Sequence, residues 1–134
     1  MTSKKNCEKR KRGLPFRADH NVLLVSDSSL VCAVADVKGQ RYSMEDTFVN
    51  STIDKADGQR IGRVFAVCDG HGGDKCSKFL RKNLAPHVAA NVCSVNPNDK
   101  EKIIAALKQA FANCQAEFEK NCEKQEHDGS TCCM

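Results

Sequence analysis

The feature that most constrains the fold is a largely apolar run, residues 61–68, which stops at residues 69–73 (Asp-Gly-His-Gly-Gly). Short apolar runs with β-branched and aromatic residues, bounded by glycine, are typical of a buried strand. Asp74, directly after the glycines, is a good N-cap residue for a helix. The sequence therefore predicts a strand that ends in a polar turn and leads straight into a helix.

Further strands are predicted on both sides of this run. Residues 30–36 and 47–53 are rich in residue types that favour β-strands. Between the second of these segments and the apolar run, Asp57-Gly58 is a typical hairpin turn. Residues 130–134 resemble the opening of another strand.

Two amphipathic helices are predicted between the apolar run and the C-terminus. The first begins near Asp74, and the second begins at Asn98 or Asp99 and runs to about residue 125, where Asp128-Gly129 ends it. The apolar positions recur at spacings of three and four residues, which indicates one buried face on each helix. These positions are Cys76, Phe79, Leu80, Leu84 and Val88 in the first helix, and Ile103, Ile104, Leu107, Phe111, Cys114 and Phe118 in the second.

The basic charge lies in a tail. Residues 1–17 carry seven Lys and Arg side chains against Glu8 alone, and the rest of the 134-residue chain is nearly neutral. We interpret residues 1–19 as a disordered basic arm, in which residues 9–12 (Lys-Arg-Lys-Arg) are either a nuclear address or a plain solvated tail. A neutral body argues against a nucleic-acid-binding domain. With no apolar run of 18 residues and no secretory signal, we expect a cytoplasmic or nuclear protein without membrane association.

The nine cysteines are expected to be reduced thiols. Nothing marks the chain as secreted, so a disulfide framework is not expected. No Cys-x-x-Cys pair is present, which disfavours a zinc ribbon. We predict that most of them fill the core as small apolar side chains.

Two polar clusters carry candidate chemistry. Arg41, Glu45 and Asp46 precede the strand at 47–53, and Asp69 and His71 follow the apolar strand. Carboxylates at strand ends suit hard divalent cations, a guanidinium suits phosphate, and a histidine can protonate a leaving oxygen. Each residue alone has a simpler explanation as a surface charge or turn. In this order and spacing, they point to metal-assisted phosphoester hydrolysis.

These motifs resemble one known family. Arg-x-x-Met-Glu-Asp, followed after a hairpin by an apolar strand ending in Asp-Gly-His-Gly-Gly, is similar to the metal-dependent protein serine/threonine phosphatases of type 2C. The resemblance covers about residues 28–134. It implies an α+β fold, namely the N-terminal part of a four-layer α-β-β-α sandwich with antiparallel sheets, truncated within the domain. Residues 20–134 would then be a partial type 2C phosphatase domain.

The resemblance also implies a metal site for two Mg²⁺ or Mn²⁺ ions. Asp69 would bridge the two metals, and the Gly70 carbonyl would bind one of them. Glu45 would be a further ligand, directly or through water, and Asp46 would hold a metal-bound water. A hydroxide shared by the metals would attack phosphorus.

The substrate would be phosphoserine or phosphothreonine in a protein. Arg41 would bind its phosphate, and His71 would be the general acid for the departing oxygen. The family's later half supplies two more metal-binding aspartates and further strands, for which this sequence has no counterpart. We therefore expect weak or no activity and low stability from this chain alone, and association with a complementary fragment or with itself. The alternative is a non-catalytic fragment that binds a phosphoprotein or another partner.

Overall fold

The computed structural model describes residues 20–26, 30–121 and 127–134. It contains two compact units, Met1–Met44 and Glu45–Met134. Among the described residues, no helix is long and apolar enough to cross a membrane. The predicted basic arm, residues 1–19, lies outside the described residues.

The first unit contains an antiparallel strand pair. β1 (His20–Ser26) pairs with β2 (Val31–Val37), with His20 opposite Val37 and Ser26 opposite Val31. β2 confirms the predicted strand at 30–36. β1 was not predicted, although residues 22–25 (Val-Leu-Leu-Val) are a short apolar run that could have indicated it.

The second unit is built on the predicted hairpin. β3 (Thr47–Asp54) pairs antiparallel with β4 (Arg60–Cys68), and Thr47 lies opposite Cys68. The turn places Gly58 at a φ of 83°, a conformation that favours glycine. Both strands and the Asp57-Gly58 turn were predicted within one residue of their ends.

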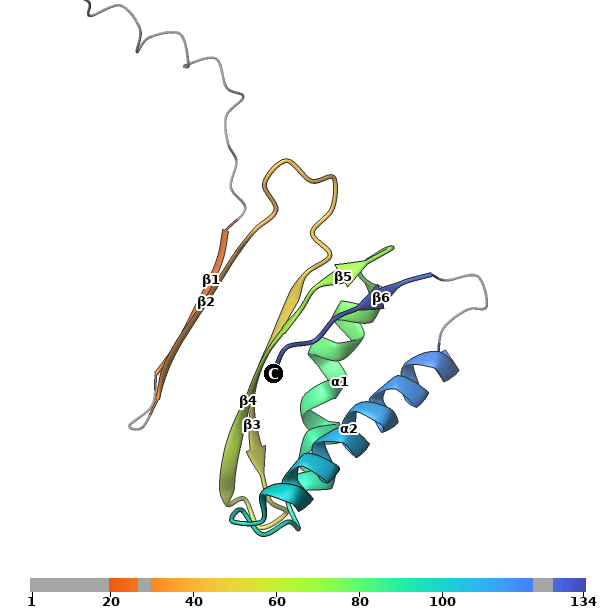
Figure 1. Ribbon diagram of the computed structural model, residues 1–134. Helices are drawn as coiled ribbons and strands as arrows, with labels where there is room; N and C mark the ends of the chain where they lie inside the picture. The colour runs from red at the N-terminus through yellow and green to blue at the C-terminus, as the bar shows by residue number, and fades with distance from the viewer. Residues whose placement is uncertain (1–19, 27–29, 122–126) are drawn as a thin grey trace, which may run out of the picture. The chain divides into compact units, whose positions relative to one another are not determined.

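The C-terminal segment of the chain, residues 129–133, lies along the end of β4 and along β5 (Gly70–His71). β5 pairs with β6 (Gly129–Ser130), and Val67 forms a β-bridge with Cys133. Residues 129–133 therefore run antiparallel to residues 67–71, so the end of β4 lies between β3 and this segment (Figure 1). The predicted strand at 130–134 is confirmed only in part, because β6 includes Ser130 and, beyond it, only Cys133 forms a β-bridge. Gly129 is a strand residue, so the prediction that Asp128-Gly129 ends the second helix was wrong.

Both predicted helices are present. α1 (Lys75–Val92) packs against β3 and against α2 (Lys100–Asn121), and both helices lie on the same side of the hairpin (Figure 1). The predicted end of the second helix, near residue 125, lies outside the described residues. Asp99 caps α2, because its Oδ1 accepts a 3.1 Å hydrogen bond from the Lys102 backbone N–H.

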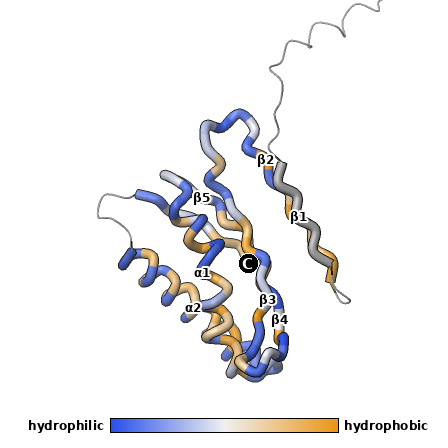
Figure 2. The backbone as a smooth tube through the Cα atoms, turned by 180° about the vertical axis from the view of Figure 1, so that it is seen from behind, coloured by the Kyte–Doolittle hydropathy of each residue, from blue (hydrophilic) through white to orange (hydrophobic). Residues whose placement is uncertain are grey.

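The core lies between the hairpin and α1. Val64, Ala66 and Cys68, which alternate along the second half of β4, are buried in it, as the period of a strand requires. Parts of β3 and β4 are hydrophobic, whereas the turn between the two strands is hydrophilic (Figure 2). The buried cluster contains Val49, Ile53, Val64, Ala66, Cys68, Leu84, Ala85, Val88 and Ala110.

The apolar face of α2 is only partly covered. Ala110 and Cys114 are buried, whereas Ile104 is 53% exposed. The described residues thus confirm an α+β fold with antiparallel strands, as predicted.

Candidate metal and phosphate site

The acidic residues of the two motifs lie at one end of the β3–β4 hairpin. Glu45 and Asp46 directly precede β3, and Asp69 directly follows β4. Continuing the register of Thr47 opposite Cys68 by one residue places Asp46 opposite Asp69. The structure therefore brings the backbones of these residues to one end of the hairpin, while their role in a shared site stays a prediction.

The backbone of Glu45 lies against Gly70. A Cβ atom on Gly70 would overlap the Glu45 carbonyl oxygen, so only glycine fits at this position. Gly70 is also buried. This close contact fixes the distance between the segment that carries the first two carboxylates and the strand end that carries Asp69.

The first turn of α1 holds the same segment from the other side. The Ser77 hydroxyl donates a hydrogen bond to the Glu45 carbonyl, and the Thr47 hydroxyl donates to the Ser77 carbonyl at 2.8 Å. Ser77 is fully buried. The sequence analysis missed both hydroxyls. The only sequence feature that could have indicated them is the position of Ser77 directly after Cys76, a residue of the apolar stripe of the helix.

Asp69 itself combines a fixed backbone with an exposed side chain. Its carbonyl accepts a 2.9 Å hydrogen bond from the Thr131 backbone N–H. Asp69 and Asp46 are exposed, and Glu45 is half-buried. The carboxylates of the two aspartates are thus reachable from solvent while their strands are anchored.

His71 lies on the edge formed by β5 and β6. It is exposed and lies opposite Gly129. A Cβ on Gly129 would overlap the His71 ring at Nε2, so the ring lies directly against the Gly129 backbone. Because Gly129 has no side chain, the ring of His71, the predicted general acid, can occupy this position.

The N-terminus of α1 is capped from a distance. Asp74 occupies the N-cap position, but its side chain makes no capping bond and instead pairs with Lys78 Nζ at 2.7 Å. The Lys75 backbone N–H donates to Asp128 Oδ2 at 2.9 Å, and that carboxylate lies against Gly73. The predicted capping position is right, whereas the residue that caps the helix is Asp128.

The donor set fits only part of a metal site. Carboxylate and backbone carbonyl oxygens, as at Asp46, Asp69 and Gly70, are ligands that Mg²⁺ and Mn²⁺ prefer. Among the described residues, no group of three or more His, Cys, Asp or Glu side chains is placed to hold an ion. These residues offer oxygen atoms of the right kind, and their role as metal ligands stays a prediction.

Arg41 belongs to the first unit. It is exposed, and its backbone N–H donates a 3.4 Å hydrogen bond to the Lys38 carbonyl. Its role as a phosphate ligand stays a prediction.

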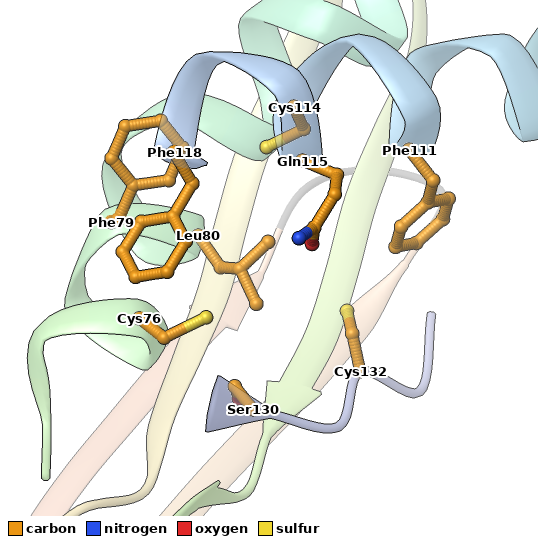
Figure 3. A pocket seen from close by; sticks show the side chains of 9 residues that line it. All are labelled: Cys76, Phe79, Leu80, Phe111, Cys114, Gln115, Phe118, Ser130 and Cys132. Carbon is orange, nitrogen blue, oxygen red and sulfur yellow. The ribbon is translucent and has the colours of Figure 1, made fainter. Parts of the chain in front are cut away.

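Apart from the acidic residues, the structure contains a concavity of about 210 Å³ between the helices and residues 130–132 (Figure 3). Its lining is mainly aromatic and thiol groups, and the Phe79 and Phe118 rings are 5.3 Å apart. Burial, with the charge of Glu117, raises the pKa of Cys114 to about 11. Apolar surroundings of this kind contain no acid-base group for phosphate chemistry.

A sulfur pair lies beside this concavity. The Cys68 thiol donates a hydrogen bond of 3.8 Å to Cys132 Sγ. This bond and burial raise the pKa of Cys68, and accepting the bond lowers the pKa of Cys132. The cysteines in the described part of the chain are free thiols. Cys68, Cys76 and Cys114 are buried, whereas the others described are half-buried or exposed, so the prediction that most cysteines fill the core is met only in part.

Comparison with known proteins decides the family. A family model described as "Protein phosphatase 2C" matches residues 30–134. The chain belongs to the protein phosphatase 2C family. The predicted resemblance over residues 28–134 is thereby confirmed.

Three curated relatives show how much of such a protein the chain matches. "Probable protein phosphatase 2C 25" of Arabidopsis thaliana is 35% identical over 72% of this chain and 23% of its own length. "Probable protein phosphatase 2C 45" of Oryza sativa subsp. japonica is 36% identical over 72% of this chain and 32% of its own length. "Probable protein phosphatase 2C 2" of Arabidopsis thaliana is 35% identical over 72% and 24%. This phosphatase 2C chain therefore spans a third or less of these relatives.

Proposed function

We propose that this chain contributes part of the active site of a metal-dependent protein serine/threonine phosphatase. One observation carries the proposal: the contact between Gly70 and the Glu45 backbone, which sets the two acidic motifs at one end of the hairpin. Membership of the phosphatase 2C family supports it.

In this proposal, Asp69, Glu45, Asp46 and the Gly70 carbonyl are the ligands that the chain offers to Mg²⁺ or Mn²⁺. When bound, such ions stabilise the charge that develops on a phosphoryl group and supply a nucleophilic water. The chain's own residues contribute placement. The anchored backbones of Glu45 and Asp69 hold the two segments that carry the carboxylates side by side, and an ion with several oxygen ligands requires such convergence.

The remaining roles fall to His71 and Arg41. An exposed imidazole can protonate the departing seryl or threonyl oxygen, which contributes typically about 10²- to 10⁴-fold in rate. A guanidinium binds phosphate oxygens through two parallel hydrogen bonds, and this pairing would orient the phosphoprotein substrate.

We expect the 134-residue chain alone to be weakly active or inactive. The described residues offer no group of three metal-binding side chains, and few ligands give weak metal affinity. A complementary polypeptide or self-association would be needed to complete the site. The same observation favours the second candidate function, a non-catalytic fragment that binds a phosphorylated partner.

The test compares three forms of the chain: the unchanged protein, Asp69→Asn, and the matched control Asp57→Asn in the exposed hairpin turn. Each is assayed for Mn²⁺ binding by calorimetry and for hydrolysis of a phosphothreonine peptide, with Mn²⁺ and with chelator. Metal-dependent turnover lost only in Asp69→Asn would support the enzyme. Mn²⁺ binding weakened at least tenfold only in Asp69→Asn would support the partial site even without turnover.

Two results would decide against a metal role. Mn²⁺ binding that is equal in all three forms would remove Asp69 from the ligand set. A fourth form, Arg41→Ala, is added for a phosphopeptide-binding assay. Binding that is unchanged by chelator and by Asp69→Asn, but is lost in Arg41→Ala, would identify the chain as a binding fragment instead.

A further inference from the structure

Cys68 and Cys132 face each other across a β-ladder. The neighbouring residues, Val67 and Cys133, exchange two backbone hydrogen bonds of 2.9 Å. Hydrogen-bonded and non-hydrogen-bonded pairs alternate along an antiparallel ladder, so the Cys68–Cys132 pair is of the non-hydrogen-bonded kind. Such pairs bring the two Cα atoms to about 4.5 Å.

This spacing suits a disulfide. Disulfides join Cα atoms that are about 4.4 to 6.8 Å apart, with an S–S bond of about 2.05 Å. The two Sγ atoms are 3.8 Å apart as free thiols. Rotation of the side chains, without a change in strand register, would bring the sulfurs to bonding distance.

The two thiols differ in access. Cys68 is fully buried. Cys132 is half-buried and lines the concavity between the helices and the last strand (Figure 3). A small oxidant from solvent would therefore meet Cys132 first, with Cys68 directly behind it.

We propose that Cys68 and Cys132 form an oxidisable pair, which hydrogen peroxide converts into a cross-strand disulfide. In the first step, the Cys132 thiol and peroxide give a sulfenic acid and water. In the second, Cys68 sulfur attacks that sulfur, the S–S bond forms, and the hydroxyl leaves as water with the Cys68 proton. The two thiols together lose two electrons, and one peroxide is reduced to two waters.

The disulfide would lock the unit that carries the acidic motifs. The two residues are 64 positions apart, and the chain between them contains both helices. Closing a long loop restricts the unfolded chain more than the folded one, and so raises stability. It would also tie the end of β4, next to Asp69, to the last strand. Peroxide would thus stabilise this unit.

The experiment uses the full 134-residue chain, reduced and then treated with hydrogen peroxide. Remaining thiols are alkylated, the protein is digested, and cross-linked peptides are mapped by mass spectrometry. We expect a peptide pair joined through Cys68 and Cys132. We also expect a melting temperature about 5 °C or more above that of the reduced chain, reversed by dithiothreitol.

Matched variants separate this pair from its neighbour. Cys133 is exposed and, as the next residue of a strand, points to the opposite face. Cys133→Ser should keep both the cross-link and the thermal shift, whereas Cys132→Ser should lose both. Peroxide products joined through Cys76 or Cys114, or only between chains, would overturn the proposal. The mapping on the unchanged chain decides this even where a variant fails to fold.

Discussion

Asp128 caps a helix that begins 53 residues before it, through a 2.9 Å hydrogen bond from the Lys75 backbone N–H to its Oδ2. The first N–H groups of a helix have no partner within the helix, and a carboxylate satisfies one of them and favours the positive end of the helix dipole. The residue directly before β6 is thereby bound to the start of α1. The same hydrogen bond therefore caps the helix and forms a tertiary contact.

The first prediction concerns this cap. Asp128→Ala should lower the free energy of unfolding by about 0.5 to 2 kcal/mol, the usual cost of losing a capping side chain. Asp128→Asn, which keeps an acceptor oxygen, should cost less. Asp74→Ala is the matched control, because Asp74 makes no capping bond. Urea unfolding measures all three, and a larger loss for Asp74→Ala than for Asp128→Ala would contradict the assignment.

This cap also marks a limit of sequence reasoning. Capping rules are local, and they select the Asp next to the helix start, here Asp74. The actual partner depends on where residues 127–130 pass in space, which rests on the pairing of β5 with β6. Strands β2, β3 and β4 were predictable, because alternation and turn glycines are properties of neighbouring residues.

In the candidate site, too, some contacts were predictable from the sequence and others were not. The adjacency of Asp46 and Asp69 follows from a hairpin whose two ends carry them, so the sequence predicted it. The Ser77–Glu45 hydrogen bond joins residues 32 positions apart and depends on how α1 packs. The facing thiols of Cys68 and Cys132 depend on a strand register that nothing local specifies.

The second prediction tests the close approach at the site. Gly70→Ala should destabilise the chain by about 1 to 3 kcal/mol or more, the cost of overpacking, because the atom in its way is the backbone oxygen of Glu45. Gly62→Ala is the control in the same hairpin, since a Cβ there meets nothing within 4 Å. Its effect should stay within about 0.5 kcal/mol. Equal unfolding midpoints in urea would show that the contact is not made.

The third prediction concerns the hydroxyl that holds the acidic segment. Ser77→Ala leaves the Glu45 carbonyl without this donor, and an unsatisfied buried acceptor costs about 1 to 3 kcal/mol. The better helix propensity of alanine offsets about half a kcal/mol of that loss. The exposed Ser94→Ala is the control and should be nearly neutral. Chemical denaturation of both variants makes the comparison, and a neutral Ser77→Ala would refute the role.

The last prediction follows from the pKa of Cys114, which burial raises to about 11 from the ordinary thiol value of 9.0. In the unfolded chain this thiol loses its proton above about pH 9, whereas in the folded chain it keeps the proton up to about pH 11. The unfolded state thus binds fewer protons in this window, and stability falls as the pH rises through it. Below pH 9 the contribution is constant and fully present.

Each pKa unit corresponds to about 1.4 kcal/mol, so Cys114 accounts for a loss of up to about 2 to 3 kcal/mol between pH 9 and pH 11. Cys114→Ala should lessen this slope, and the remaining part includes Cys68, whose pKa is also raised. Urea titrations under reducing conditions, at pH 8, 9, 10 and 11, measure it. The exposed Cys133→Ala should keep the slope of the unchanged chain. A slope that Cys114→Ala leaves unaltered would mean that burial does not protect this thiol from ionisation.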